Sequence, residues 1–215
     1  MAEGGTLVCL LDRGGQWSHL GTTPKLAVDA MLLDIKFLDD ATRPKAPRLE
    51  GVTEAQREPG RHLKMIHDHL RQNMQTIGGL IERASAGTIT PEEIAAETAD
   101  LEIVDNYRRF GNLCGRYCQV VHTHHSIEDH SLFPALRAQG EAFAKVADRL
   151  QAEHVVVHEL LLRQIDTLNA LVREPSSSRF EDAREVYEAL GRVLLSHLGY
   201  EEEEIGDALG YFEIM

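Results

Sequence analysis

The chain has 215 residues, 43% of them hydrophobic and 27% charged, and a formal net charge of −13. This size and composition are typical of a globular protein with one domain, or with one domain and an appendage. A surface this acidic repels phosphate backbones, which argues against nucleic acid as a partner, and no apolar run approaches the ~18 residues of a membrane span. Three cysteines in no zinc-like pattern argue against a disulfide framework and against a thiolate metal site.

Residues 1–56 are predicted to form an N-terminal extension. Residues 6–11 have the apolar character of a short strand or loop, but the run is too short for a signal-peptide core and lacks a basic lead-in, so we expect a cytoplasmic location. Thr23-Pro24 places a capping residue before a proline at the first helical position, which predicts a helix over 24–41. The prolines within 43–47 end that helix, and a lid or packing helix is its simplest role.

Residues 57–215 are predicted to form the main domain, an all-α, antiparallel, up-down four-helix bundle. Four segments carry apolar residues at helical spacing and are separated by short stretches rich in Gly, Pro and Ser. Their expected bounds are 60–86, 90–131 with an interruption at Phe133-Pro134, 141–173 and 180–206. Short connections between long helices make successive helices antiparallel neighbours.

Histidine is unusually frequent, at 11 residues. Three predicted helices carry a pair of donor residues four positions apart, and residues at that spacing lie on one helix face. The pairs are His124 with Glu128, His154 with His158, and His197 with Glu201. Each pair continues the apolar stripe of its helix. On the first helix His69 shares a face with Met65 and Leu80, whereas His67 points the other way.

These side chains are predicted to face the interior of the bundle. An unpaired buried polar group costs about 1–3 kcal/mol, and a buried carboxylate costs far more. A satisfied core residue is the simplest interpretation of one buried histidine, but not of seven polar groups around one interior. No Lys or Arg lies on these faces to pair with the two carboxylates, so we expect metal cations as the counter-charge. Imidazoles and carboxylates together suit iron, manganese or zinc.

The order of these motifs resembles the hemerythrin-like (HHE cation-binding) domains. The resemblance covers about residues 60–206 and is carried by HHSIEDHSLFP (124–134), HVVVH (154–158) and HLGYEEEE (197–204). It implies a hemerythrin-like bundle that holds two non-haem iron ions with an oxo or hydroxo bridge. Carried over residue by residue, the metal ligands are His69, His124, Glu128, His154, His158, His197 and Glu201. Oxygen-carrying members tend to have Asp, one residue further on, in place of Glu201, which argues against dedicated oxygen transport.

With two octahedral ions, this ligand set and a bridge leave about one of ~12 coordination positions open. The resemblance therefore implies a protein that binds or reacts with O₂, peroxide or nitric oxide, with catalase-like peroxide decomposition as the enzymatic form. One alternative is a module that senses O₂ or nitric oxide without turnover and signals through residues 1–56 to a protein partner of unknown identity. Another is metal storage or a structural zinc site. The spacings of ferritin-like and zinc-protease ligand motifs do not occur.

Several residues near these motifs have two interpretations. Tyr117 falls on the same stripe as the second-helix ligands, where it is either a proton donor or electron relay beside the metals or an ordinary core residue. Residues 202–204 are three glutamates that are either additional ligands or the solvated end of the last helix. His125 and His62 are the residues best placed to replace a ligand in the assigned set.

Overall fold

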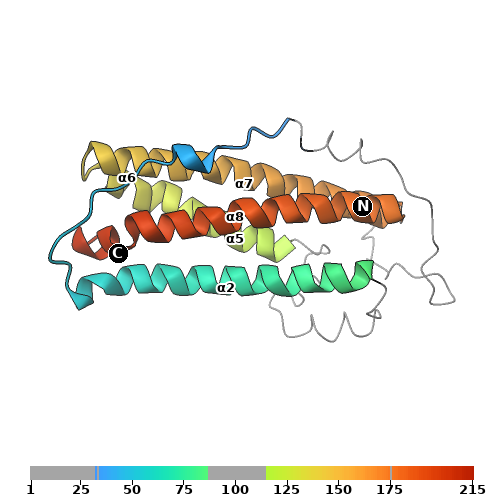
Figure 1. Cartoon of the computed structure of the whole chain (residues 1–215), viewed down its shortest axis with the longest axis horizontal. Coiled ribbons are helices and arrows are strands. Elements are labelled where there is room, and N and C mark those ends of the chain that lie inside the picture. Colours follow the sequence, from blue (N-terminus) through green and yellow to red (C-terminus); the bar gives the residue numbers. More distant parts are fainter. Residues whose placement is uncertain (1–31, 33, 87–114, 175) are drawn as a thin grey trace, which may run out of the picture. The chain divides into compact units, whose positions relative to one another are not determined.

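The computed structural model describes residues 32, 34–86, 115–174 and 176–215, and every regular element in these ranges is helical (Figure 1). The long helices are α2 (Glu54–Ser85), α5 (Gly115–Ile127), α7 (Glu141–Arg173) and α8 (Ser177–Tyr211). The short elements are η1 (Asp40–Thr42), η2 (Glu128–Leu132) and α6 (Phe133–Arg137). None of the described helices combines the length and the apolar character needed to cross a membrane.

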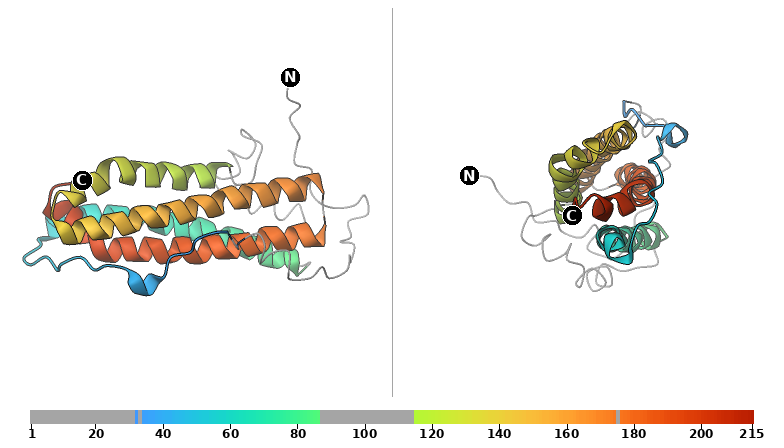
Figure 2. Two further views of the ribbon diagram at one scale, coloured as in Figure 1. Left: turned by 90° about the horizontal axis from the view of Figure 1, so that it is seen from above. Right: turned by 90° about the vertical axis from the view of Figure 1, so that its left-hand side faces the viewer.

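The chain divides into two compact units. The first, here called the histidine-rich unit, comprises Lys36–Gln72, Val121–Glu159 and Gly191–Met215. It contains parts of α2, α7 and α8 together with the end of α5, η2 and α6, and these pack as four helical segments around one axis (Figure 2). The predicted all-helical, four-helix architecture is confirmed for the described residues.

The second unit comprises Met1–Ile35, Asn73–Val120 and Leu160–Leu190. In its described part the Tyr187 hydroxyl donates to the Met74 carbonyl (2.5 Å), and Arg163 pairs with Asp34. The predicted strand over 6–11 lies outside the described residues.

Neighbouring segments of the histidine-rich unit run antiparallel. Towards the start of α2, Gly60 faces Gly206 of α8, and later in α2 His67 reaches Glu202, which comes earlier in α8. A Cβ atom on Gly60 would lie 2.5 Å from the carbonyl oxygen of Gly206. Glycine at this position therefore lets the two backbones approach closely and sets which face of α2 meets α8.

The polar interior of this unit lies between two apolar layers. A cluster on one side fills the end of the unit near the α6–α7 turn, and its members are Leu63, Leu132, Phe133, Leu136, Phe143, Val146, Ala147, Leu150, Tyr200, Ile205, Ala208 and Leu209. On the other side each helix contributes a fully or nearly fully buried aliphatic residue, namely Leu70, Val121, Val157 and Leu194. Water is thus excluded from the polar layer along the bundle axis in both directions.

The second helical segment runs on to Arg137 through the position where an interruption was predicted. In η2, a π-helical turn, the N–H of Phe133 donates to the carbonyl of Glu128 five residues earlier. Pro134, which has no N–H to donate, directly follows this π turn and does not end the helical segment. A π turn adds one residue to the helix and rotates the residues after it, so Glu128 and Phe133 both face the interior.

α2 begins six residues earlier than predicted. Pro59 and Gly60 argue against helix, but Thr53 and Gln56 form a capping box: the Thr53 N–H donates to the Gln56 side chain (3.0 Å), and the Gln56 N–H donates to the Thr53 hydroxyl (3.3 Å). α7, in contrast, has the predicted bounds, 141–173.

The segment before α2 differs from expectation where it is described. Residues 35–39 are not helical, so the helix predicted over 24–41 does not reach its expected end. The segment instead runs along α7 and α8, held by contacts from residues 40–46, and the Asp39 side chain caps η1 by accepting from the Ala41 N–H (2.9 Å). The division into an extension over 1–56 and a domain over 57–215 stays a prediction.

Candidate metal centre

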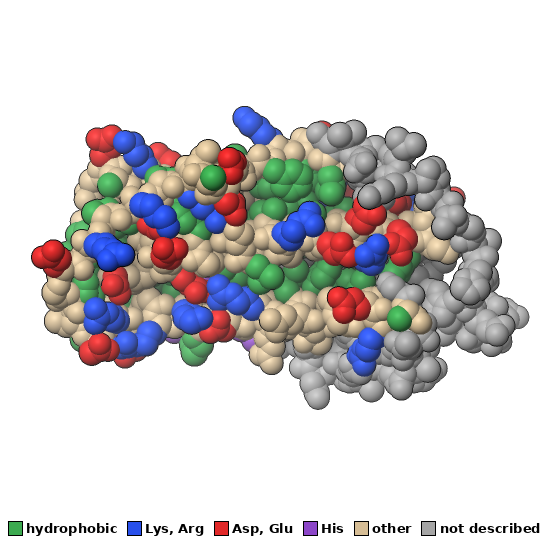
Figure 3. Space-filling view, viewed as in Figure 1, with side chains coloured by type: hydrophobic (Ala, Val, Ile, Leu, Met, Phe, Trp, Pro, Cys, Tyr) green, Lys and Arg blue, Asp and Glu red, His purple; other side chains and the backbone are tan. Residues whose placement is uncertain are grey.

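Two groups of His and Glu side chains meet inside the histidine-rich unit. The three-histidine group consists of His125, His154 and His197; the mixed group consists of His67, His124, Glu128 and Glu201. Within each group the potential ligand atoms all lie within 4.8 Å of one another, and every member except the partly buried His124 is buried. On the face drawn in Figure 3, histidine is visible only in small areas at the lower edge.

The rings of His154 and His197 direct bare nitrogens at each other. Nδ1 of His154 donates to Asp129 (2.9 Å), and Nδ1 of His197 donates to Glu153 (3.1 Å). In a neutral imidazole whose Nδ1 carries the proton, Nε2 has no proton and presents a lone pair. The two Nε2 atoms nevertheless lie 3.1 Å apart. Two lone pairs at this distance repel each other unless a cation is bound by both.

His67 and His124 also bring two ring nitrogens together, in the mixed group. Nδ1 of His67 donates to Glu202 (2.9 Å), and its Nε2 lies 2.9 Å from Nε2 of His124. Adjacent ligands of one octahedral ion, with bonds of about 2.1 Å, lie about 3 Å apart. The spacing within both imidazole pairs therefore fits ligands that share an ion.

Each buried carboxylate lies between an imidazole of the mixed group and an imidazole of the three-histidine group. Glu128 has Oε1 3.1 Å from Nε2 of His124 and Oε2 3.5 Å from Nε2 of His154. Oε2 of Glu201 lies 3.5 Å from Nε2 of His67 and 3.7 Å from Nε2 of His197. Both carboxylates are thus placed to be shared by two cations.

The electrostatics of this interior are unfavourable for the protein alone. Both oxygens of Glu128, both oxygens of Glu201 and Nε2 of His125 are buried without a hydrogen-bond partner. Burial raises the pKa of Glu201 to about 8 and that of Glu128 well above its ordinary range. Burial also lowers the pKa of His67 to about 3 and that of His197 to about 4. Bound cations would favour the ionised carboxylates and the neutral imidazoles that metals require.

Two of the three acids behind the imidazoles, Glu202 and Glu153, are themselves held by arginines. Glu202, which accepts from His67, is paired with Arg71 (2.7 Å). Glu153, which accepts from His197, is bound by Arg149 (2.6 Å) and by Arg43. A carboxylate on Nδ1 fixes the orientation of the ring and raises the basicity of the Nε2 that binds the metal.

Sequence reasoning did not single out these acids for this role. It offered residues 202–204 only as additional ligands or as a solvated helix end. Asp129 and Glu202 each directly follow a buried glutamate, and Glu153 directly precedes a buried histidine. The sequence signal that could have found them is an acidic residue directly next to a predicted ligand. In the structure each of these acids bonds a histidine of another helix.

The structure brings together five of the residues expected as ligands: His124, Glu128, His154, His197 and Glu201. On α2 it places His69 at the surface and His67 in the mixed group, although the opposite was expected. The buried stripe of α2 runs from Leu63 through His67 and Leu70, whereas Met65, which had marked the inner face, is 60% exposed.

A similar exchange occurs between α7 and α5. His158 is exposed, and its ring lies beside that of the exposed His122, with 5.2 Å between ring centroids. His125, noted as a possible replacement, is buried and stacks on His154 at 3.8 Å. His62, the other possible replacement, is exposed. For Tyr117 the structure describes the backbone within α5 but not the side chain.

Comparison with known proteins identifies one family. Residues 92–209 match the family model described as the Hemerythrin HHE cation binding domain. The match covers more than half of the chain and includes every member of both groups except His67. Neither the curated proteins nor the solved structures yielded a match.

Proposed function

Because the chain belongs to the hemerythrin HHE cation-binding family, we propose that it is a non-haem di-iron protein that binds or reacts with O₂, peroxide or nitric oxide. The observation that carries the proposal is the pair of carboxylates between two sets of opposed imidazole nitrogens, with 3.1 Å and 2.9 Å between the nitrogens. Five imidazoles and two carboxylates also match the donor types that suit iron.

The proposed ligands divide between two ions. The three-histidine group would hold one ion, and His67 with His124 would hold the other. Glu128 and Glu201 would be shared, since each lies near both groups. When bound, an iron pair supplies redox chemistry and an open position for a small ligand.

The chain's own residues would limit what reaches this centre. The aliphatic layers on both sides exclude water along the bundle axis, and a ligand with two non-hydrogen atoms fits such an interior far better than a polymer does. We therefore propose a diatomic molecule or peroxide as the partner. Exclusion of nucleic acid and membrane as partners, and a cytoplasmic location, stay predictions from the sequence.

Metal analysis with visible spectroscopy tests the proposal. Protein purified from its native host should contain two iron ions per chain and a visible absorption that changes when peroxide is added. Zinc in place of iron, with no visible absorption, would overturn the proposal and favour a structural or storage site.

Peroxide decomposition separates the enzymatic form from sensing. If the protein is catalase-like, the iron-loaded form releases O₂ from peroxide, His124→Ala abolishes the release, and the exposed control His62→Ala retains it. The sensing alternative is favoured by the contacts between the segment before α2 and the acid that holds His197. It predicts a stable adduct with O₂ or nitric oxide and no turnover.

A further inference from the structure

The segment before α2 is fastened to one face of α8. Residues 40–46, here called the strap, make three contacts with side chains spaced four positions apart on that helix. Ser196 donates to Asp40 (2.5 Å), Tyr200 donates to the carbonyl of Pro44 (2.7 Å), and Glu204 accepts from the N–H of Ala46 (2.6 Å). Because residues at this spacing form one line along a helix, the strap is aligned with the turns of α8 that carry His197 and Glu201.

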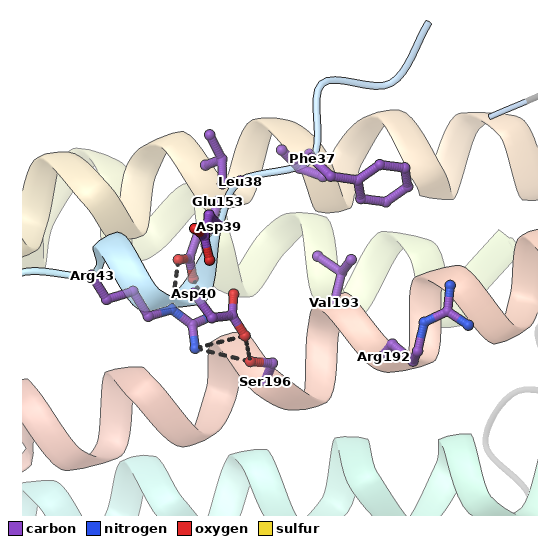
Figure 4. Close-up of a pocket in the computed structure, with 10 residues that line it drawn as sticks. Phe37, Leu38, Asp39, Asp40, Arg43, Glu153, Arg192, Val193 and Ser196 are labelled. Atoms are coloured by element: carbon purple, nitrogen blue, oxygen red, sulfur yellow. Dashed lines mark hydrogen bonds and ion pairs between the residues drawn. The ribbon is translucent and has the colours of Figure 1, made fainter. Parts of the chain in front are cut away.

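Arg43 is the strap residue that reaches inward. Its Nε and Nη2 donate to the two oxygens of Glu153 on α7 (2.8 and 2.9 Å), and its Nη1 donates to Ser196 (2.9 Å) (Figure 4). The guanidinium lies 4.6 Å from the ring centroid of Tyr200. A bidentate pairing of this kind fixes the plane of the carboxylate as well as its position.

Glu153 connects this pairing to the metal centre. It is 3% exposed, and its Oε2 accepts from Nδ1 of His197 (3.1 Å). Burial alone would raise the pKa of Glu153, but hydrogen bonds from His197, Arg43 and Arg149 outweigh burial and bring the pKa to about 2. The strap also binds Arg149, which donates to Thr42 (2.8 Å). The strap therefore supplies one of the two arginines that hold Glu153 and contacts the other.

The Arg43–Glu153 pair can be reached from outside the bundle. Both residues line a pocket of about 290 Å³ between the strap, α7 and α8, whose other walls include Phe37, Val156 and Val193 (Figure 4). Undocking the strap would therefore rehydrate Arg43 and Glu153, and it would also uncover the part of the apolar cluster against which Ala46 packs.

We propose that Arg43 is a positioning residue, which holds Glu153 so that His197 keeps Nε2 directed at its metal ion, and that docking of the strap thereby sets how tightly the three-histidine group binds. This inference rests on the proposed function only in requiring that the centre binds cations. It gives the chain before α2 a physical route to the metal centre, through the strap, Glu153 and His197.

Cobalt(II) binding tests the inference without iron or turnover. The affinities of the bound ions are measured by competition with a chromogenic chelator, and the visible spectrum of bound cobalt reports changes in its ligands. Arg43→Gln should weaken the binding of one of the two ions by about 10-fold and alter the cobalt spectrum. Loss of a partner behind a metal ligand typically costs 10–100-fold in affinity, and we expect the lower end of this range because the variant releases the partner, Glu153, without removing it. Arg43→Lys should recover part of the affinity, since lysine keeps the charge but not the bidentate geometry.

The matched control is Lys45→Gln, which removes a strap cation that pairs with Glu203 and Glu204 and makes no contact with Glu153. It should leave both affinities and the spectrum unchanged. Arg43→Gln affinities within two-fold of wild type would overturn the inference, as would an equal loss in Lys45→Gln. If the wild type binds two cobalt ions and Arg43→Gln has no effect, the inference alone is refuted. If the wild type binds no cation, the proposed function is refuted as well.

Discussion

Replacing Glu201 with glutamine is expected to stabilise the metal-free protein and to reduce the stabilisation that bound metal provides. Burial raises the pKa of Glu201 from its ordinary 4.5 to about 8, so at pH 7 the folded metal-free protein holds this carboxyl protonated. In the unfolded chain the carboxyl is ionised, and protonating it costs about 3 kcal/mol, at roughly 1.36 kcal/mol per pH unit above its ordinary pKa. Glutamine is neutral and similar in size, so Glu201→Gln should stabilise the metal-free protein by up to about 3 kcal/mol.

In the metal-loaded protein the same change removes a charged ligand that lies near both groups of imidazoles. Ligand binding to the native state stabilises it in proportion to the logarithm of the affinity. A 100-fold weaker interaction therefore removes about 2.7 kcal/mol of the stabilisation that saturating metal provides. The variant should therefore gain less from metal than the wild type does, and loading should cancel most of the advantage that it has without metal.

Urea unfolding at pH 7, in chelator and in saturating metal, measures both effects. Glu203→Gln is the matched control, because it removes the same charge from an exposed side chain of the same helix and should leave both midpoints nearly unchanged. A Glu201→Gln variant no more stable than wild type in chelator would show that the buried carboxylate is not costly. A variant that gains as much from metal as the wild type would show that Glu201 is not a ligand.

Two further predictions rest on the placement of His67 and on the shifted pKa values. In a metal titration, His67→Asn should reduce the number of bound cations from two to one, or weaken the binding of one cation by more than 10-fold. His69→Asn should change neither the number of bound cations nor their affinities, because His69 is exposed. Equal effects of the two substitutions would refute the placement of His67. The metal-free protein should lose stability as pH falls below 6.5, because burial holds the pKa of His67 at about 3 and that of His197 at about 4 and only the unfolded chain takes up these protons. Glu201 acts in the opposite sense: between its ordinary pKa of 4.5 and its folded pKa of about 8 only the folded chain keeps this proton, so its contribution to stability falls as pH rises and is lost near pH 8. Metal should abolish this loss in urea midpoints measured from about pH 4 to about pH 9.

Local signals in the sequence explain why some elements were predictable. Gly140, just before α7, has φ 122°, a backbone conformation that other residues rarely adopt, and Pro175 follows the last turn of the same helix. Such residues mark helix ends whatever surrounds them, and the bounds of α7 were predicted correctly. The donor composition of the interior, five imidazoles and two carboxylates, was also readable, because the stripe through α5 and η2 that carries Glu128 and the stripe of α8 that carries Glu201 are both clear.

The rotation of α2 about its axis was not predictable in the same way. His67 and His69 both fall within an amphipathic helix, and choosing Met65 as the inner marker turned the helix away from its true orientation. What sets the orientation is tertiary: Gly60 lies against the backbone of Gly206, where no side chain fits. Contacts of this kind join residues far apart in sequence, so the periodicity of one helix cannot reveal them.

The origin of His67 bears on how the centre is completed. The family match begins at residue 92 and so contains a single imidazole, that of His124, for the mixed group; the second comes from α2, outside the match. The acid that orients His67 is Glu202, which directly follows the buried Glu201 on α8 and is paired with Arg71 of α2. Two consecutive residues of α8 thus contact the same histidine, one at each ring nitrogen. The close packing of α2 on α8 is therefore what converts an incomplete set of ligands into two opposed imidazole pairs.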